Sequence, residues 1–176
     1  MENIRIYVAS LADYNAGKLH GVWIDATDTP EEIAEQVSVM LGASTQPDAE
    51  EWSIHDYEGF EGFNLSEFES FEFVSWLAGM IDEHGKVFVS FLETFEPSKL
   101  SFSRENRESA ALDFEERFRG CFDSETDFVE SLIEDLGFLK DCDPQIRAYF
   151  DVSRYARDLF TGGDFIFADG AVFHNY

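Results

Sequence analysis

The chain carries sixteen Asp and Glu residues and no Lys or Arg from Leu19 to Gly85. A second stretch without basic residues, Gly120 to Leu139, contains six more acids. In total there are 37 acidic and 12 basic residues, which give a formal net charge of −25 at pH 7. Because like charges repel one another in a compact state, a bias this large indicates a demand of function or environment.

The acidic excess does not predict disorder. Hydrophobic residues make up 44% of the chain and aromatic residues 16%, including 19 Phe, whereas disordered acidic chains have few aromatic residues. A length of 176 residues suits one ordinary domain or two to three small ones with a real core. Direct binding of nucleic acid is disfavoured, because a DNA-binding protein neutralises phosphates with Lys and Arg.

A location in the cytoplasm is expected. The opening residues MENIRIYVAS lack the basic and long apolar regions of a secretion signal, and no stretch approaches 18 consecutive apolar residues. Cys121 and Cys142 form no CxxC pair and are expected to be reduced core residues. These features predict a protein without membrane insertion or disulfide bonds.

Residues 1–62 are predicted to form an N-terminal α+β domain. The apolar stretches Ile4–Ser10 and Leu19–Ile24 flank a turn-rich segment and are typical of a hairpin. Thr29 is expected to cap a helix, with Pro30 at its first position and Glu32 closing a capping box. A third strand is predicted from Trp52 to Tyr57, and Gly42 is expected to end the helix.

Residues 63–112 are predicted to form a central, mainly helical domain. Ser66 and Glu69 fit a capping box before an apolar run that Gly85 closes. The segment Val87–Phe95 has high β-propensity, but its apolar residues follow helical spacing. We therefore predict a helix there, ending at Pro97.

Residues 113–176 are predicted to form a C-terminal α+β domain that begins with a helix through Phe118. Asp169-Gly170 between two apolar stretches predicts a closing hairpin. Ser124 can cap an acidic helix between these elements. Helical spacing then places two sets of residues on opposite faces. The acidic set is Asp127, Glu130 and Glu134, and the apolar set is Phe128, Leu132, Leu136 and Leu139.

The candidate binding residues are carboxylates on such acidic faces. A single acidic face is ordinarily the solvated side of an amphipathic helix. Here the pattern recurs without the interspersed Lys that exposed helices normally carry. The candidate residues are Glu31, Glu32, Glu35, Glu67, Glu69, Glu72, Asp123, Asp127, Glu130, Glu134 and Asp135.

The amount of charge suggests imitation of DNA. Duplex DNA carries one negative charge per ~1.7 Å, so the net charge matches roughly 42 Å of duplex, or about 12 base pairs. Two other functions stay open: a small acidic hydrolase or metal-dependent enzyme, and a salt-adapted acidic scaffold. Catalytic motifs such as GxSxG, Walker A and HExxH are missing, and the four His lack metal-ligand spacing. No cofactor or metal is therefore expected.

Three separated segments, in order, resemble the ArdA antirestriction family. Ile6–Gly17 with Gly21–Trp23 is similar to its N-terminal signature, and Ile54–Glu58 to the next one. The ending is similar over Asp151–Leu159 and the hairpin from Phe165 to Phe173. The acidic helix, taken as Phe128–Leu139, resembles the segment called the antirestriction motif.

The resemblance implies an elongated α+β protein of three small domains, encoded on a mobile genetic element of bacteria. It also implies a homodimer that inhibits type I restriction-modification enzymes by DNA mimicry, with the methyltransferase core as partner. No catalysis, nucleic acid or membrane is expected in that role.

Overall fold

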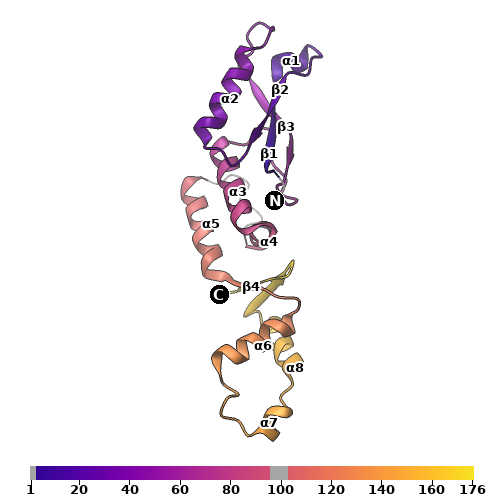
Figure 1. Cartoon of the computed structure of the whole chain (residues 1–176), viewed down its shortest axis with the longest axis vertical. Helices are drawn as coiled ribbons and strands as arrows, with labels where there is room; N and C mark the ends of the chain where they lie inside the picture. The colour runs from indigo at the N-terminus through magenta and orange to yellow at the C-terminus, as the bar shows by residue number, and fades with distance from the viewer. Residues whose placement is uncertain (1–2, 96–102) are drawn as a thin grey trace. The chain divides into compact units, whose positions relative to one another are not determined.

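The computed structural model describes residues 3–95 and 103–176. In these residues the chain is an α+β protein with two small antiparallel sheets and eight helices, which confirms the predicted class (Figure 1). It divides into two compact units, one ending at Val89 and the other beginning at Ser90. The predicted division into three domains stays a prediction.

Unit 1 is a three-stranded sheet in the order β2-β1-β3, with helix α2 packed against β2 and β1 (Figure 1). The predicted hairpin and third strand are confirmed, although a short helix replaces part of the turn-rich segment. The elements are β1 (Arg5–Ser10), α1 (Leu11–Asn15), β2 (Gly21–Asp25), α2 (Pro30–Gly42), β3 (Trp52–Glu58) and α3 (Phe71–His84).

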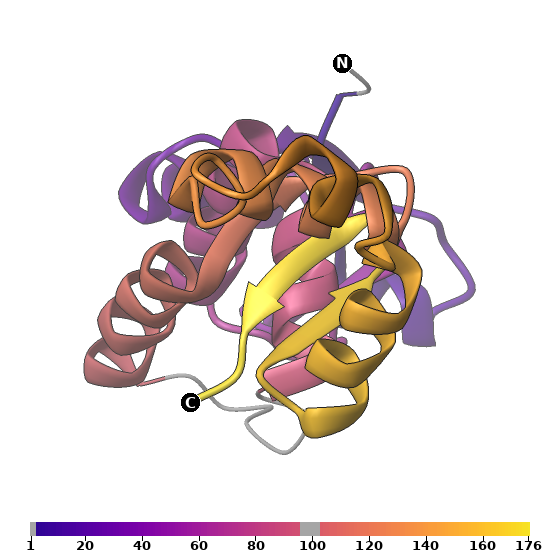
Figure 2. The same ribbon diagram turned by 90° about the horizontal axis from the view of Figure 1, so that it is seen from below.

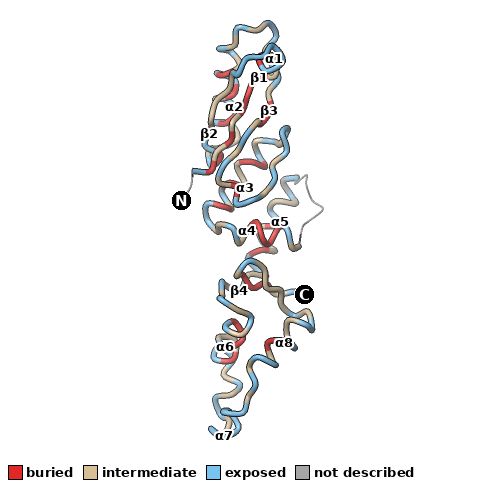
Figure 3. The backbone as a smooth tube through the Cα atoms, turned by 90° about the vertical axis from the view of Figure 1, so that its right-hand side faces the viewer, coloured by how far each residue is buried: buried red, intermediate tan, exposed pale blue. Residues whose placement is uncertain are grey.

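The start of α2 follows the sequence prediction in detail. The Thr29 hydroxyl accepts a hydrogen bond from the backbone N–H of Glu32, and the Glu32 carboxylate accepts one from the backbone N–H of Thr29. Both bonds satisfy backbone donors that a helix start leaves without partners. With its start fixed, α2 buries one apolar face, made of Ile33, Val37 and Met40 (Figure 3).

The predicted cap of α3 is wrong. The helix begins after Ser70, whose hydroxyl accepts from the backbone N–H of Phe73 at 3.2 Å. The residues from Ser66 to Glu69 form a turn instead, because the carbonyl of Glu67 accepts from the backbone N–H of Ile54 in β3 at 2.8 Å. This long-range bond competes with a helical conformation at Ser66. Gly85 closes α3 with φ 62°, as predicted.

The ambiguous segment after Gly85 is helical, as its spacing predicts. Helix α4 (Lys86–Phe95) contains the boundary between the two units. In unit 1 the Phe88 ring packs edge-on against Trp76, with centroids 5.6 Å apart. The predicted end at Pro97 lies outside the described residues.

Unit 2 contains a second sheet in the order β4-β6-β5 (Figure 2). The predicted hairpin is confirmed, and positive φ angles at Asp169 and Gly170 fit its two-residue turn. The third strand, β4, pairs with β6 and was not predicted. The elements are α5 (Arg104–Arg117), β4 (Phe118–Cys121), α6 (Glu125–Leu136), α7 (Pro144–Ala148), α8 (Val152–Gly162), β5 (Phe165–Ala168) and β6 (Ala171–His174).

The acidic helix α6 packs against α8 but is shorter than predicted. Gly137, with φ 64°, ends it, so Leu139 lies beyond the helix and packs against the core from the following turn. Leu136, predicted on the apolar face, is 64% exposed because it lies at the last position of the helix. The expectation of core cysteines is also wrong, because Cys121 is exposed and Cys142 is half-buried.

Asp13 is a buried carboxylate that ties α1 to the loop after α2. The Ser44 hydroxyl donates to its Oδ2 at 2.5 Å, and this bond is the main reason that the pKa of Asp13 lies below its ordinary value of 3.8. Burial opposes the shift, and the Ser10 hydroxyl adds to it. A carboxylate with a lowered pKa stabilises the fold at pH values above its unfolded pKa.

We expect this stabilisation to disappear as the pH falls from about 4 through the lower folded pKa, where Asp13 becomes protonated. The free energies of urea unfolding of the wild type and Asp13→Asn should differ at pH 6, and the difference should shrink as the pH falls below about 4. Glu61→Gln, which neutralises an exposed loop carboxylate, is the matched control and should change stability little at either pH. A difference for Asp13→Asn that is constant with pH would contradict this role.

Candidate functional site

Nearly all the acids of the first basic-free stretch lie at the surface of unit 1. Fourteen of the sixteen are exposed, and the other two, Asp28 and Glu69, are half-buried. In the second stretch, in unit 2, all six acids are exposed. The carboxylates of these two stretches therefore lie mostly outside the buried cores of the two units and are available to a partner (Figure 3).

Helix α2 holds the first predicted group. Glu31, Glu32 and Glu35 are exposed, and the apolar face of the helix is turned to the sheet. Bonds from the hydroxyl and backbone of Thr29 hold the pKa of Glu32 below its ordinary value. Glu31 and Glu35 are four residues apart, which corresponds to a rise of about 6 Å along the helix axis. Three negative charges thus occupy just over one helical turn.

The second predicted group is not a ridge on one helix. Glu72 is exposed in the first turn of α3, whereas Glu67 and Glu69 precede the helix. Burial raises the pKa of Glu69, and a backbone hydrogen bond at Ser70 partly opposes this shift. Only Glu67 and Glu72 therefore present exposed charges, and the shared helical face predicted for the three residues is wrong.

The third group lies on α6 and the residue before its cap. The Ser124 hydroxyl accepts from the backbone N–H of Asp127 at 3.1 Å, so the predicted cap is confirmed. Phe128, Val129 and Ile133 are buried on the opposite side, in the core shared with α8. The exposed acids brought together here are Asp123, Asp127, Glu130, Glu134 and Asp135.

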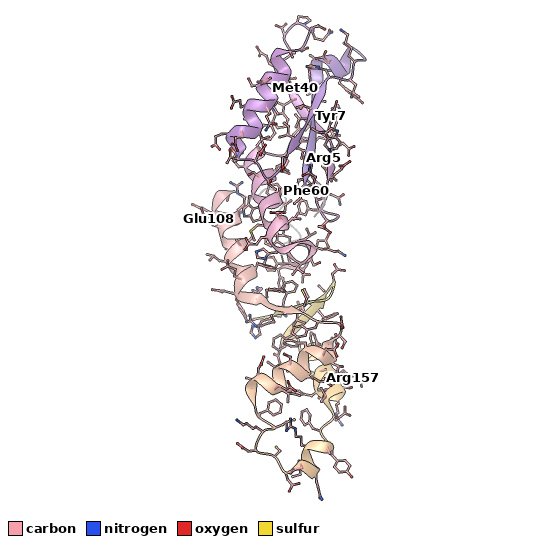
Figure 4. The ribbon with its side chains drawn as sticks, in the orientation of Figure 1. Arg5, Tyr7, Met40, Phe60, Glu108 and Arg157 are labelled. Carbon is pink, nitrogen blue, oxygen red and sulfur yellow. The ribbon has the colours of Figure 1, made fainter. Side chains whose placement is uncertain are left out.

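Two Arg–carboxylate pairs lie outside these groups. Arg5–Glu58 and Arg117–Asp113 each close at 2.7 Å, and neither includes a candidate residue. Arg5 projects from β1 beside Tyr7, and its guanidinium also lies over the Trp23 ring (Figure 4). The exposed candidate carboxylates can attract a partner rich in Lys and Arg.

Sequence reasoning missed a groove on unit 1 lined in part by Asp28, Gln36 and Val39. One signal was available, because Val39 is apolar but lies about 100–160° around the helix from the three residues of the buried stripe, Ile33, Val37 and Met40. It is 69% exposed. In the described ranges 3–95 and 103–176, no three His, Cys, Asp or Glu side chains are grouped as metal ligands. In the same ranges, no helix is long and apolar enough to cross a membrane.

Comparison with known proteins places these observations in a family context. A family model described as "Antirestriction protein (ArdA)" matches residues 6–174, nearly the whole chain. The match includes both sheets and all the acidic groups described above. A search of curated proteins gave no match.

Proposed function

The chain belongs to the ArdA antirestriction family, and we propose that it blocks type I restriction-modification enzymes by binding their DNA-binding groove in place of DNA. Antirestriction is the function of the family. The enzyme targeted and the mimicry of DNA are our proposal. In this role the protein is an inhibitor and makes or breaks no covalent bond.

One observation carries the proposal: the carboxylates of both basic-free stretches are exposed on α2, on α6 and around the sheet of unit 1. The DNA groove of a methyltransferase core presents Lys and Arg that normally meet phosphates. Carboxylates can meet the same cations, and long-range attraction would speed the encounter. The protein then competes with DNA through charge and not through base contacts.

The proposed assembly is a homodimer that acts in the cytoplasm of a bacterial cell. Two copies would match roughly 85 Å of duplex, on the basis of one charge per ~1.7 Å. Such a length suits a large DNA-modifying enzyme with more than one DNA-binding subunit.

Displacement of labelled duplex DNA from a purified type I restriction-modification enzyme tests the proposal. The protein should displace the DNA, and its binding should weaken by at least an order of magnitude between 50 and 200 mM salt, as for a ligand with several charge contacts. Glu130→Gln should change the affinity less than about fivefold, because one exposed pair contributes below about 1 kcal/mol. Binding that is indifferent to salt, or a complete loss with Glu130→Gln, would argue for a discrete site instead.

A further inference from the structure

Strand β2 lies at an edge of its sheet, with β1 as its strand neighbour in the described residues (Figure 1). The backbone N–H of Ala26 donates to the carbonyl of Ile4 at 2.9 Å. Ala26 therefore faces β1 with its backbone groups, and the alternation along β2 can be counted from this residue. Because such positions alternate in an antiparallel ladder, the backbone groups of Gly21 and Trp23 point away from β1. These donors and acceptors face the edge of the sheet.

A groove of about 440 Å³ borders this edge. One side is Val22 of β2, whose neighbours in sequence are the two residues with outward backbone groups. The other side is α2 and the residues just before it, and the ionisable groups in the lining are all carboxylates. The full lining is Val22, Asp28, Glu32, Glu35, Gln36 and Val39.

Hydrogen bonds hold the two sides of the groove in place. The Gln36 amide donates to Asp28 Oδ2 at 2.9 Å, which joins α2 to the loop before it. At the start of β2, the His20 Nε2 lies 2.7 Å from the carbonyl of Met40 near the end of α2. These two bonds tie α2 to the loop before it and to the start of β2, so both sides of the groove are held within unit 1.

We propose that the edge of β2 and this groove together bind an extended, basic segment of a partner protein as an added strand. The backbone groups of Gly21 and Trp23 would form the new ladder, as in other strand-addition complexes. Every second side chain of the segment would face α2. At these positions the carboxylates attract Lys or Arg, and Val22 and Val39 offer apolar contact to the carbon chains of the same side chains.

Charge decides the class of partner. The lining contains three carboxylates and no basic residue, so it carries net negative charge. Arg5 lies over the Trp23 ring, on the opposite face of β2 from Val22, and is paired with Glu58. An acidic segment would be repelled, and a neutral one would gain only the ladder and the two Val contacts. An unprotected edge strand can also pair with strands of unintended proteins. The acidic border would limit such pairing to segments that carry basic residues. This inference goes beyond DNA mimicry, because it requires recognition of a peptide backbone.

The test uses a fluorescein-labelled (Lys-Val)₃ peptide with an acetylated and an amidated end, in 0.15 M salt. Fluorescence anisotropy should show binding, and amide hydrogen exchange should slow at Gly21 and Trp23 by about tenfold or more, because these amides become hydrogen-bonded. The control peptide has the same side chains but a methyl group on every backbone nitrogen. It should bind at least about tenfold more weakly, because it cannot donate to the ladder.

Two matched variants locate the site. Glu35→Lys reverses a charge in the groove lining, and Asp56→Lys reverses an exposed charge on β3, the strand at the other edge of the same sheet. The first should weaken peptide binding about tenfold. The second should weaken it less than about threefold, because two strand spacings separate β3 from β2 by roughly 10 Å, which exceeds the Debye length of about 8 Å at this salt. Absence of binding, equal binding of the methylated peptide, equal effects of the two variants or unchanged exchange at Gly21 and Trp23 would each overturn the proposal. No restriction enzyme is present in this assay, so its result is independent of the DNA-mimic proposal.

Discussion

Neutralising six exposed carboxylates together should reduce inhibition of a type I restriction-modification enzyme by about 100-fold. This estimate takes about 0.5 kcal/mol for each exposed charge contact and about 1.4 kcal/mol for a tenfold change in affinity. The residues are chosen because each is exposed and none closes a capping box through its side chain. The combined variant carries Glu31→Gln, Glu35→Gln, Asp127→Asn, Glu130→Gln, Glu134→Gln and Asp135→Asn.

The matched control exchanges Glu for Asp and Asp for Glu at the same six positions, which keeps every charge. It should inhibit within about threefold of the wild type if charge, and not shape, carries recognition. The neutralised variant should also show a smaller dependence of affinity on salt, while its thermal stability stays equal or rises because repulsion is reduced. Full inhibition by the neutralised variant would contradict mimicry through these surfaces.

Phe173→Ala should destabilise unit 2 by about 3–5 kcal/mol, the usual cost of truncating a fully buried Phe. Phe173 lies on the central strand β6 and is 0% exposed. Its ring centroid lies 5.9 Å from those of Phe91 and Phe118 and 5.8 Å from that of Phe95. Removal of this ring would leave a cavity between α4 and the sheet, and the neighbouring side chains cannot readily fill it.

Urea unfolding followed by two probes measures the loss of stability in unit 2 separately from unit 1. All three Trp residues lie in unit 1, so Trp fluorescence follows that unit, while far-UV circular dichroism also reports unit 2. The dichroism transition should move to lower urea in Phe173→Ala. Phe68→Ala is the control, because Phe68 is 67% exposed and its truncation should cost about 0.5 kcal/mol or less. An unchanged dichroism transition in Phe173→Ala would contradict the proposed packing.

Much of the local structure could be predicted from neighbouring residues. The capping box of Thr29, the cap at Ser124 and the Asp169-Gly170 turn each depend on residues within four positions along the chain. Val87–Phe95 is helical despite its β-propensity, because its apolar residues recur with the helical period and can pack as one continuous face. The acidic character of the candidate surface likewise followed from composition alone.

Features that need distant partners could not be predicted. Ser66 has the sequence of a cap, but pairing of Glu67 with β3 moves the start of α3 to Ser70. Strand β4 exists because β6, about fifty residues later, offers it a ladder.

The acidic charge, the starts of α2 and α6 and the two hairpins follow from residues close together in the chain, because short-range hydrogen bonds and periodic burial depend on local order. The exposure of each carboxylate, and the position of an acidic groove beside the edge of β2, follow from tertiary packing. Both properties depend on the packing of elements that lie far apart in the sequence. Contacts between such elements leave no pattern among neighbouring residues of the chain.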